Sequence, residues 1–235
     1  MTDASADGAL LELAGVQVSL PSTVGPVNIL RGIDLSIGRG EAVAVVGPSG
    51  AGKSTLMMVV AGLERISAGR ISLAGHELSS LDEDGLALLR RKHVGIVFQS
   101  FRLVPTMTAL ENVAVPLELA GRHDAFDAAG EALTSVGLGH RLEHYPDQLS
   151  GGEQQRVAIA RAVVAKPSLI LADEPTGNLD GDTGHQIIEL LFERRRATGS
   201  TLMLITHDPE LAGRADRIIR LADGKVVSES VGAIA

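Results

Sequence analysis

The sequence predicts an α/β fold with a mostly parallel sheet. Runs of strand length that are apolar throughout, such as "AVAVV" from Ala42 and "SLILA" from Ser168, alternate with segments of helical periodicity. Strands that are apolar on both faces are typical of parallel sheets, because helices cover both sides. Glycine is frequent, with 27 residues in a chain of 235, which indicates several tight turns or close backbone approaches.

The individual elements follow from this alternation. Residues 9–46 are expected to form short strands broken by turn residues, and the last of these strands ends at Gly47. The other expected elements are helices at about 53–63, from Ser80 or Asp82 to about Arg91, at 106–136 and 181–197, and after Ser150, and strands at 68–75, 94–98, 168–172, 201–205 and on both sides of the turn at Asp223. The helical stretch at about 101–150 has no strand within it, so we expect an insertion into the sheet.

Composition and charge exclude several classes of protein. Aromatic residues make up only 2% of the chain and the net charge is −8, so no nucleic-acid partner is expected. Two short basic runs, at Arg90 and Arg194, lie on predicted helices and are expected to be solvated. The chain has no cysteine, which excludes disulfides and thiolate metal sites. The acidic start lacks a signal-peptide pattern and no apolar run approaches the roughly 18 residues of a spanning helix, so we expect a cytoplasmic protein.

The strand from Ala42 runs into "GPSGAGKST", which matches the phosphate-loop pattern G-x-x-x-x-G-K-[ST] between a strand and a helix. Glycines allow successive backbone N–H groups to surround the phosphates of a nucleotide. Lys53 is expected to reach the β- and γ-phosphates, and Ser54 to bind Mg²⁺. The predicted nucleotide-binding residues of this loop are Gly47, Pro48, Ser49, Gly50, Ala51, Gly52, Lys53, Ser54 and Thr55.

Two carboxylates, Asp173 and Glu174, end the apolar strand in "SLILADEP". Ligands of parallel sheets bind beyond the carboxyl ends of the strands, and adjacent strand residues point in opposite directions. Asp173 is therefore expected to hold Mg²⁺ through water, and Glu174 to polarise the attacking water. An acidic pair alone is common at strand ends, so this assignment depends on the phosphate loop in the same chain.

Two more polar residues follow predicted strands. Gln99, in "VFQSF", is a candidate Mg²⁺ ligand that senses the γ-phosphate. His207, in "LITHD", is a candidate to hydrogen-bond the γ-phosphate and to hold Glu174 and the water in register. Taken singly, a surface amide and a satisfied histidine are the commoner explanations.

The stretch "LSGGEQQR", from Leu149 to Arg156, starts a helix with two glycines. Ser150 and Glu153 fit a capping box, in which each side chain satisfies a backbone N–H. A cap alone does not require Gly151 and Gly152, each of which costs up to ~1 kcal/mol relative to alanine. Bare N–H groups at the positive end of a helix dipole form an anion site, so we expect a phosphate there.

In order, the chain carries "GPSGAGKST", the glutamine of "VFQSF", "LSGGEQQR", "LILADEP", "GNLD" ending at Asp180, and "ITHD". With these motifs it resembles the nucleotide-binding subunit of an ABC transporter over essentially its whole length. The strings "RRKHVGIVFQSFRLVPTMTALENV" and "ADEPTGNLD" resemble the lipoprotein-release and macrolide-export subgroup, with LolD, MacB and YbbA-like members. The resemblance implies a single ABC ATPase domain over 1–235, of the P-loop NTPase fold. It places a core with an N-terminal antiparallel β-subdomain at about 1–100 and 156–235, and an inserted α-helical subdomain at about 101–155.

The resemblance also implies ATP hydrolysis, with ATP and Mg²⁺ as cofactors. Glu174, His207 and Lys53 would be catalytic, and the metal ligands would be Ser54, Gln99 and Asp173. Two copies would pack head to tail, so that the signature of one chain binds the γ-phosphate of ATP held by the other. The residues expected at that contact are Ser150, Gly151, Gly152 and Glu153, with Asp180 coupling the two sites.

A second copy of the chain and an integral membrane permease are the implied partners, with the chain peripheral on the inner face of the cell membrane. By the same resemblance, the segment after Gln99 lines the groove for a coupling helix of the permease, unless its residues belong to the core of their own subdomain, and different members can do each. The residues are Phe101, Leu103, Val104, Pro105 and Leu110. Two functions remain open. A transport motor would export or extract a lipid, lipoprotein or drug, and its ATPase activity would respond to apolar compounds. An ATP-gated signalling switch would act on a permease-like partner that regulates a cell-envelope enzyme, without transport. It would be insensitive to such compounds and would depend on an extracytoplasmic partner.

One position departs from the family pattern. Many members stack adenine on an aromatic residue near the equivalent of Val18–Leu20, whereas this chain has no aromatic residue before His76. Stacking contributes ~1–3 kcal/mol per base, and Leu20 would supply only apolar contact. We therefore expect other purine triphosphates to be used nearly as well as ATP. A strong measured preference for ATP over GTP would contradict this expectation.

Overall fold

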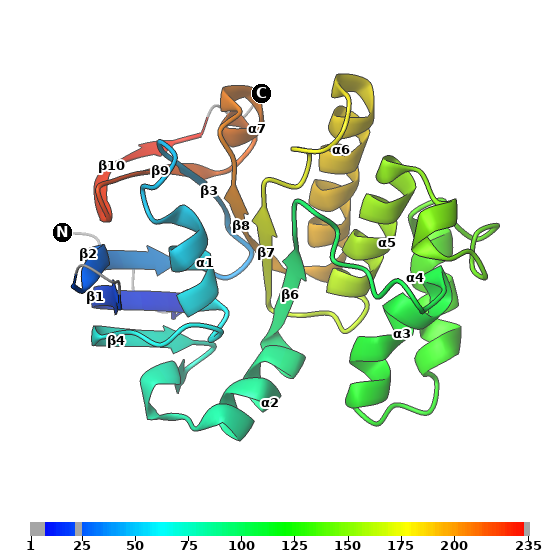
Figure 1. The fold of residues 1–235 in the computed structure, drawn as a ribbon, viewed down its shortest axis with the longest axis horizontal. Helices are drawn as coiled ribbons and strands as arrows, with labels where there is room; N and C mark the ends of the chain where they lie inside the picture. Colours follow the sequence, from blue (N-terminus) through cyan, green and yellow to red (C-terminus); the bar gives the residue numbers. More distant parts are fainter. Residues whose placement is uncertain (1–7, 22–24, 233–235) are drawn as a thin grey trace. The chain divides into compact units, whose positions relative to one another are not determined.

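The structure is a computed structural model that describes residues 8–21 and 25–232 (Figure 1). It divides into two compact units. Unit 1 consists of the residues up to Arg90 and those from Thr201 onward, and unit 2 is Arg91–Ser200. Of the helices in the described residues, none has the length and apolar character needed to span a membrane.

Unit 1 contains a four-stranded antiparallel sheet, which confirms the predicted antiparallel β-subdomain. Its strand order is β2-β1-β4-β5. The bounds are β1 Leu11–Leu20, β2 Val27–Ile37, β4 Ala68–Leu73 and β5 His76–Glu77. Along much of β1 and β2, buried residues alternate with more exposed ones, as expected for a sheet with one face on a core.

A second group of strands in unit 1 is mostly parallel. β3 pairs in parallel with β8 and with β9, and β10 pairs antiparallel with β9. The bounds are β3 Ala42–Val46, β8 Thr201–Ile205, β9 Arg217–Ala222 and β10 Lys225–Val231, with the helices α1 Lys53–Val60 and α7 Pro209–Gly213 and the 3-10 turn η1 Leu78–Ser80. Every residue of β8 and all but the last of β3 are buried, which confirms the continuously apolar strands of the sequence.

Unit 2 holds one parallel pair of strands and most of the helices. β6 pairs in parallel with β7. The bounds are β6 Val94–Val97, β7 Leu169–Asp173, α3 Ala109–Leu119, α4 Ala125–Ser135, η2 Pro146–Gln148, α5 Gly151–Val163 and α6 Gly181–Thr198, while α2 Glu83–His93 crosses the boundary between the units. α5 packs against β6, α3, α4 and α6, and it is therefore the central helix of this unit.

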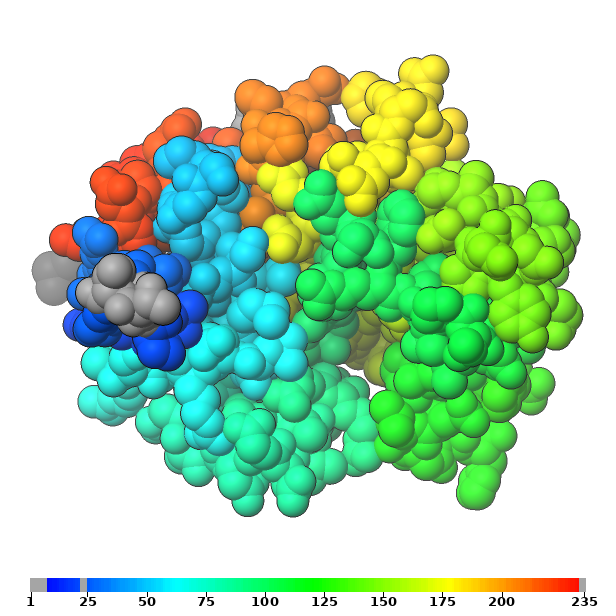
Figure 2. Space-filling view, viewed as in Figure 1, coloured from blue at the N-terminus to red at the C-terminus, as the bar shows by residue number. Residues whose placement is uncertain are grey.

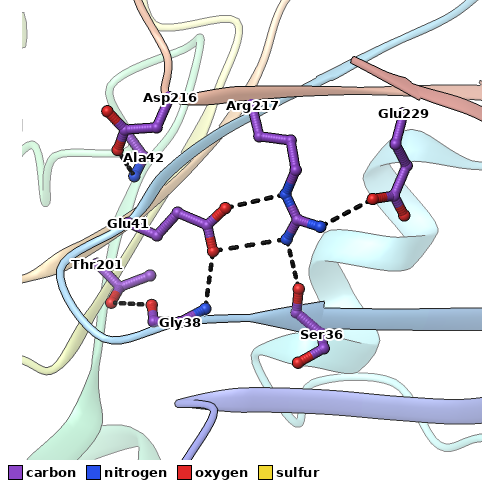
Figure 3. Close-up of polar contacts among 8 residues, drawn as sticks. All are labelled: Ser36, Gly38, Glu41, Ala42, Thr201, Asp216, Arg217 and Glu229. Carbon is purple, nitrogen blue, oxygen red and sulfur yellow. Dashed lines mark hydrogen bonds and ion pairs between the residues drawn. The ribbon is translucent and has the colours of Figure 1, made fainter. Parts of the chain in front are cut away.

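One ionic cluster in unit 1 ties the beginnings of β3 and β9 to their neighbours (Figure 3). The Arg217 guanidinium donates to Glu41 at 2.9 Å and to Glu229 at 2.8 Å, and also to the Ser36 carbonyl. Glu41 accepts in turn from the Gly38 N–H at 2.7 Å. Because parallel strands bind ligands beyond their carboxyl ends, this cluster lies at the end of the strands that ligands do not use. We expect it to contribute to stability alone.

The two basic runs are less solvated than the sequence predicts. Arg90 is half-buried and donates to the Gly62 carbonyl at 2.6 Å. The side chain of Arg194 is 19% exposed, and its Nε is buried without a partner in the described residues. The expectation of a solvated face is wrong for these two arginines, because a hydrogen bond ties Arg90 to the main chain of unit 1 and most of the Arg194 side chain is withdrawn from water.

Candidate functional site

The phosphate loop follows β3 and is packed against the backbone of two neighbouring strands of unit 1. A Cβ at Gly47 would lie 2.0 Å from the carbonyl oxygen of Leu221, in β9. A Cβ at Gly52 would lie 2.9 Å from a methyl group of Leu30 and 3.2 Å from the Ile29 carbonyl oxygen, in β2. These two glycines of the motif are therefore required by close packing, in addition to any role in binding.

The turn between β9 and β10 supports the same loop. The Gly224 N–H donates to the Ala51 carbonyl at 3.2 Å. Asp223 and Gly224 have φ values of 47° and 72°, the left-handed pair of a tight hairpin. A Cβ at Gly224 would lie 2.2 Å from the Ile29 carbonyl oxygen, so the turn fits between β2 and the phosphate loop.

The other face of the loop is open. Pro48, Ser49, Gly50 and Ser54 are exposed, and α1 begins directly afterwards at Lys53. The Lys53 ammonium donates to the carbonyls of Gly47 at 2.8 Å and Pro48 at 3.0 Å, which holds it against the loop. An exposed loop that ends at a helix N-terminus beside an ammonium group fits a phosphate chain.

His207 lies at the same edge of unit 1 as the phosphate loop. β3 and β8 run parallel, with Val45 opposite Ile205, and these strands lead to the loop and to His207 respectively. His207 is exposed and follows the buried Thr206. The next residue, Asp208, caps α7 with its carboxylate, which accepts from the Glu210 N–H at 2.8 Å. Unit 1 thus places Lys53, Ser54 and His207 together at one edge.

In unit 2, the parallel pair β6 and β7 brings Gln99 to the same edge as Asp173 and Glu174, because Val97 lies opposite Ala172. The Gln99 carbonyl accepts from the Asn178 amide at 2.9 Å. The Gln99 side-chain amide lies 2.6 Å from the place of a Cβ at Gly177. Gln99 therefore lies against the "GNLD" loop.

The signature helix begins as the sequence predicts. The Ser150 N–H donates to Glu153 at 2.9 Å and the Glu153 N–H donates to the Ser150 hydroxyl at 3.3 Å, which confirms the capping box. Arg141 donates to the other oxygen of Glu153 at 3.1 Å. These contacts, led by the hydrogen bond from the Ser150 backbone, lower the pKa of Glu153 against the opposing effect of burial.

The two signature glycines pack against other site loops of unit 2. A Cβ at Gly152 would lie 2.6 Å from the methyl group of Thr183, in the first turn of α6. A Cβ at Gly151 would lie 3.3 Å from Leu179 and 3.7 Å from Phe101. The interpretation of these glycines as room for an anion is therefore incomplete, because Gly152 is also required for contact with α6.

Asp180 is the N-cap of α6. Its carboxylate accepts from the Thr183 N–H at 2.9 Å, and this hydrogen bond is the main cause of its lowered pKa. Asp180 thus fixes the residue whose methyl group meets Gly152. Unit 2 thereby brings Gln99, the signature and the "GNLD" loop into one cluster.

The segment after Gln99 is at the surface. Phe101, Leu103 and Leu110 are half-buried, Pro105 is exposed and Val104 is 38% exposed. In Figure 2 the part of the chain after β6, in green, lies open on the visible face. A purely core role for these five residues is therefore excluded.

Two residues that hold the site loops are absent from the sequence predictions. They are Gln155 and Arg161, both on α5, which reach the main chain near Glu174 and after Gln99. Gln155 was recognisable as a polar residue one turn before the buried Ile159, on the apolar side of the helix. Leu20, which we expected to make apolar contact with the base, is the last residue of β1 and is half-buried. Residues 22–24 lie outside the described residues.

Comparison with known proteins identifies the family. A family profile described as "ABC transporter" matches residues 30–177. The chain belongs to the ABC transporter family. The curated relatives include the ABC transporter ATP-binding protein YbbA of Escherichia coli K12, 49% identical over 94% of this chain and 98% of that protein. The lipoprotein-releasing system ATP-binding protein LolD 1 of Rhodospirillum rubrum is 47% identical over 94% of this chain and 98% of its own length.

A solved structure agrees with this assignment. The ATP-binding cassette MJ0796, a dimer in a post-hydrolysis state with ADP and Pi, has a TM-score of 0.87 and 39% identity, covering 94% of this chain and 98% of its own. As a member of the family, this ABC cassette is an ATPase that uses ATP and Mg²⁺, and its partners are a second cassette and a membrane permease.

Proposed function

We propose that this cassette is a motor subunit that closes head to tail with a second copy around two ATP molecules and drives a separate permease. The observation that supports the proposal is that one chain carries two features suited to binding an anion. Unit 1 has the phosphate loop, and unit 2 has the capped N-terminus of α5. When each ATP contacts the loop of one copy and the signature of the other, ATP stabilises the closed pair and loss of the γ-phosphate releases it.

Each residue then has a distinct role. The loop from Gly47 to Thr55 holds the phosphates, with Lys53 at the γ-phosphate. Ser54, Gln99 and Asp173 would hold Mg²⁺, with Asp173 acting through water. The metal would supply positive charge to offset that of the phosphates. Glu174 polarises the attacking water.

His207 is proposed to donate a hydrogen bond to the γ-phosphate oxygen and to keep Glu174 in register. Its exposed position beside the phosphate-loop edge supports this role. Ser150, Gly151, Gly152 and Glu153 are proposed to form the contact with the partner copy's nucleotide, and Asp180 to link the two sites through its cap on α6.

The work done is proposed to be extraction or export of a lipid, lipoprotein or drug, with the chain on the inner face of the membrane. The likeness to a lipoprotein-releasing ATP-binding protein supports this class of cargo. The exposed segment at Val104 and Pro105 is proposed as the surface that receives the permease. ATPase activity of the cassette with its permease should rise when a lipidated peptide is added. Insensitivity to lipids, together with dependence on an extracytoplasmic protein, would instead favour the signalling switch.

Glu174→Gln tests the closed pair. This variant should retain nucleotide binding, nearly abolish turnover and form a stable dimer in saturating MgATP, as measured by light scattering after size exclusion. Ser150→Arg is the matched change at the other anion site. It should stop hydrolysis while leaving the nucleotide affinity of the single chain unchanged. A Glu174→Gln chain that stays monomeric in saturating ATP contradicts the proposal.

A further inference from the structure

α5 contacts the main chain of both loops that carry the hydrolytic groups of unit 2. Gln155 lies one turn after the signature glycines, and Arg161 lies six residues further on, about 9 Å along the helix axis. Both side chains reach loops of unit 2, and Gln155 is fully buried while Arg161 is half-buried. Figure 1 shows α5 beside the chain that leaves β6.

Gln155 holds the turn that follows Glu174. Its amide Nε2 donates to the Pro175 carbonyl at 2.6 Å. Glu174 itself has a φ of 44°, a left-handed conformation that is costly for a residue with a Cβ. The Gly177 N–H closes the turn by donating to the Glu174 carbonyl at 3.0 Å. The direction of the Glu174 side chain therefore depends on a turn whose central carbonyl is fixed by Gln155.

The burial of Gln155 indicates that the donor is needed. Its Oε1 is buried and has no hydrogen-bond partner within the described residues, which makes the amide a costly choice. A leucine or methionine of similar volume would avoid this cost if packing were the only requirement.

Arg161 holds the loop that follows Gln99. Its guanidinium donates to the Arg102 carbonyl at 2.8 Å and to the Phe101 carbonyl at 2.9 Å. Phe101 and Arg102 have φ values of 58° and 49°, so two consecutive residues with a Cβ are left-handed. The Arg102 guanidinium also lies 4.2 Å from the centre of the Phe98 ring, which closes the loop around Gln99.

The positive charge of Arg161 strengthens its hydrogen bonds to these two carbonyls. The partial burial of this guanidinium lowers its pKa. In the described residues it forms no ion pair with a carboxylate, and its hydrogen bonds go to the two loop carbonyls. A half-buried cation that hydrogen-bonds a strained loop indicates that the loop conformation matters.

We infer that Gln155 and Arg161 are positioning residues of ATP hydrolysis, which set Glu174 and Gln99 by holding the main chain beside each of them. This inference rests on the proposed roles of Glu174 and Gln99. A consequence follows from the position of both on the signature helix. Because a helix moves as a rigid body, a shift of its N-terminus by the partner's nucleotide reaches Glu174 and Gln99 of the same chain, so the two ATP sites are coupled.

The first experiment is a pH profile of Gln155→Glu. A protonated carboxyl donates to the Pro175 carbonyl as the amide does, whereas a carboxylate repels it. The kcat of Gln155→Glu relative to wild type should therefore fall at least 10-fold over roughly pH 6 to 9, the range in which buried glutamates titrate. Gln155→Met, which cannot donate at any pH, should show a constant low ratio. A constant ratio for Gln155→Glu overturns the role of Gln155.

The second experiment separates Arg161 from an ordinary helix arginine. Arg161→Met should lower kcat about 10- to 100-fold with KM within about 2-fold, because displaced catalytic groups cost rate more than binding. Arg161→Lys, which keeps the charge and one donor, should be intermediate. Arg156→Met is the matched control, since Arg156 also lies on α5 and donates to a carbonyl, that of Val136 at 3.2 Å, away from the site loops. It should retain kcat within about 2-fold.

Equal losses for Arg161→Met and Arg156→Met overturn the role of Arg161. If Arg161→Met does not fold, as judged by circular dichroism, Arg161→Lys against Arg156→Lys replaces it, with the same two outcomes. Failure of the proposed function is distinguishable, because then the wild-type chain lacks Mg²⁺-dependent hydrolysis or Glu174→Gln does not dimerise. If both of those succeed and the kinetic differences are absent, only the present inference is wrong.

Discussion

The phosphate loop of unit 1 and the Gln99–Glu174 edge of unit 2 are held by opposite means. In unit 1, backbone lies directly on backbone, and the contact exists because Gly47, Gly52 and Gly224 have no Cβ. In unit 2, the loops lie further from their support, and long side chains from α5 bridge the distance to the carbonyls. Backbone contact requires one residue type in the loop itself, whereas side-chain support is encoded elsewhere in the chain.

The largest effect is expected for Gly224→Ala, which breaks the backbone contact from outside the motif. The added Cβ would lie 2.2 Å from the Ile29 carbonyl oxygen, so the turn must leave Ala51. We expect the clash and strain to cost the binding-competent loop ~3 kcal/mol. This corresponds to roughly 100-fold weaker nucleotide binding, measured by titration calorimetry. Gly75→Ala is the control, with a φ of 82° but nothing within 4 Å of its Cβ. It should lose about 1 kcal/mol of stability and no affinity. Equal affinity losses would show that strain alone matters.

Gly152→Ala sharpens the comparison, because it tests a glycine of unit 2 that meets a side chain. The new methyl group would lie 2.6 Å from the methyl group of Thr183, a β-branched residue with little rotamer freedom. The unfolding free energy should fall by about 1–2 kcal/mol. Adding Thr183→Ser removes the opposing methyl group and should restore most of that stability in urea unfolding.

Hydrolysis should not recover in the same double variant. The alanine methyl group still covers the N–H groups proposed for the partner's phosphate, so kcat should stay roughly 10-fold or more below wild type. Recovery of both stability and kcat would mean that Gly152 serves packing only, and that the anion-site interpretation is wrong.

A smaller effect, confined to stability, is expected for Arg217→Met. The variant removes the donor shared by Glu41, Glu229 and the Ser36 carbonyl, at the end of β9 away from the phosphate loop (Figure 3). Stability should fall by about 1–2 kcal/mol, since several charge-assisted bonds share a partly buried group. Nucleotide affinity of the folded protein should not change. Arg65→Met, which breaks the exposed pair with Glu83, should cost less than ~0.5 kcal/mol. An affinity loss in Arg217→Met would place this cluster in the site.

The smallest effect concerns pH and the signature cap. The pKa of Glu153 is lowered in the folded chain, mainly by the Ser150 N–H, so its contribution is complete above the ordinary value of 4.5 and is lost as the pH falls below it. The contribution is that of a helix cap, about 1 kcal/mol or less. Glu153→Gln, which keeps the acceptor, should flatten the dependence of stability on pH between about 5 and 3. An unchanged slope would assign the pH dependence to other carboxylates.

The phosphate loop and the capping box were predictable from the sequence because their contacts are local. Ser150 and Glu153 are three residues apart, and the motif glycines lie in a run of six between a strand and a helix. The positions of Gln99 and Asp173 at one edge of unit 2, and of His207 at the phosphate-loop edge of unit 1, were also predictable, since parallel strands within each unit deliver the residues that follow them to the same edge. Local chemistry and sheet direction together determined these positions.

The supports of these loops were not predictable. Gln155 and Pro175 are 20 residues apart, Arg161 and Phe101 are 60 apart, and Gly47 meets Leu221 across most of the chain. The sequence by itself determined which groups can bind phosphate and Mg²⁺, because that chemistry resides in residue types at fixed short spacing. Only the tertiary structure decided which residues hold those groups in place, because support comes from whichever backbone or side chain packing brings within a few ångströms.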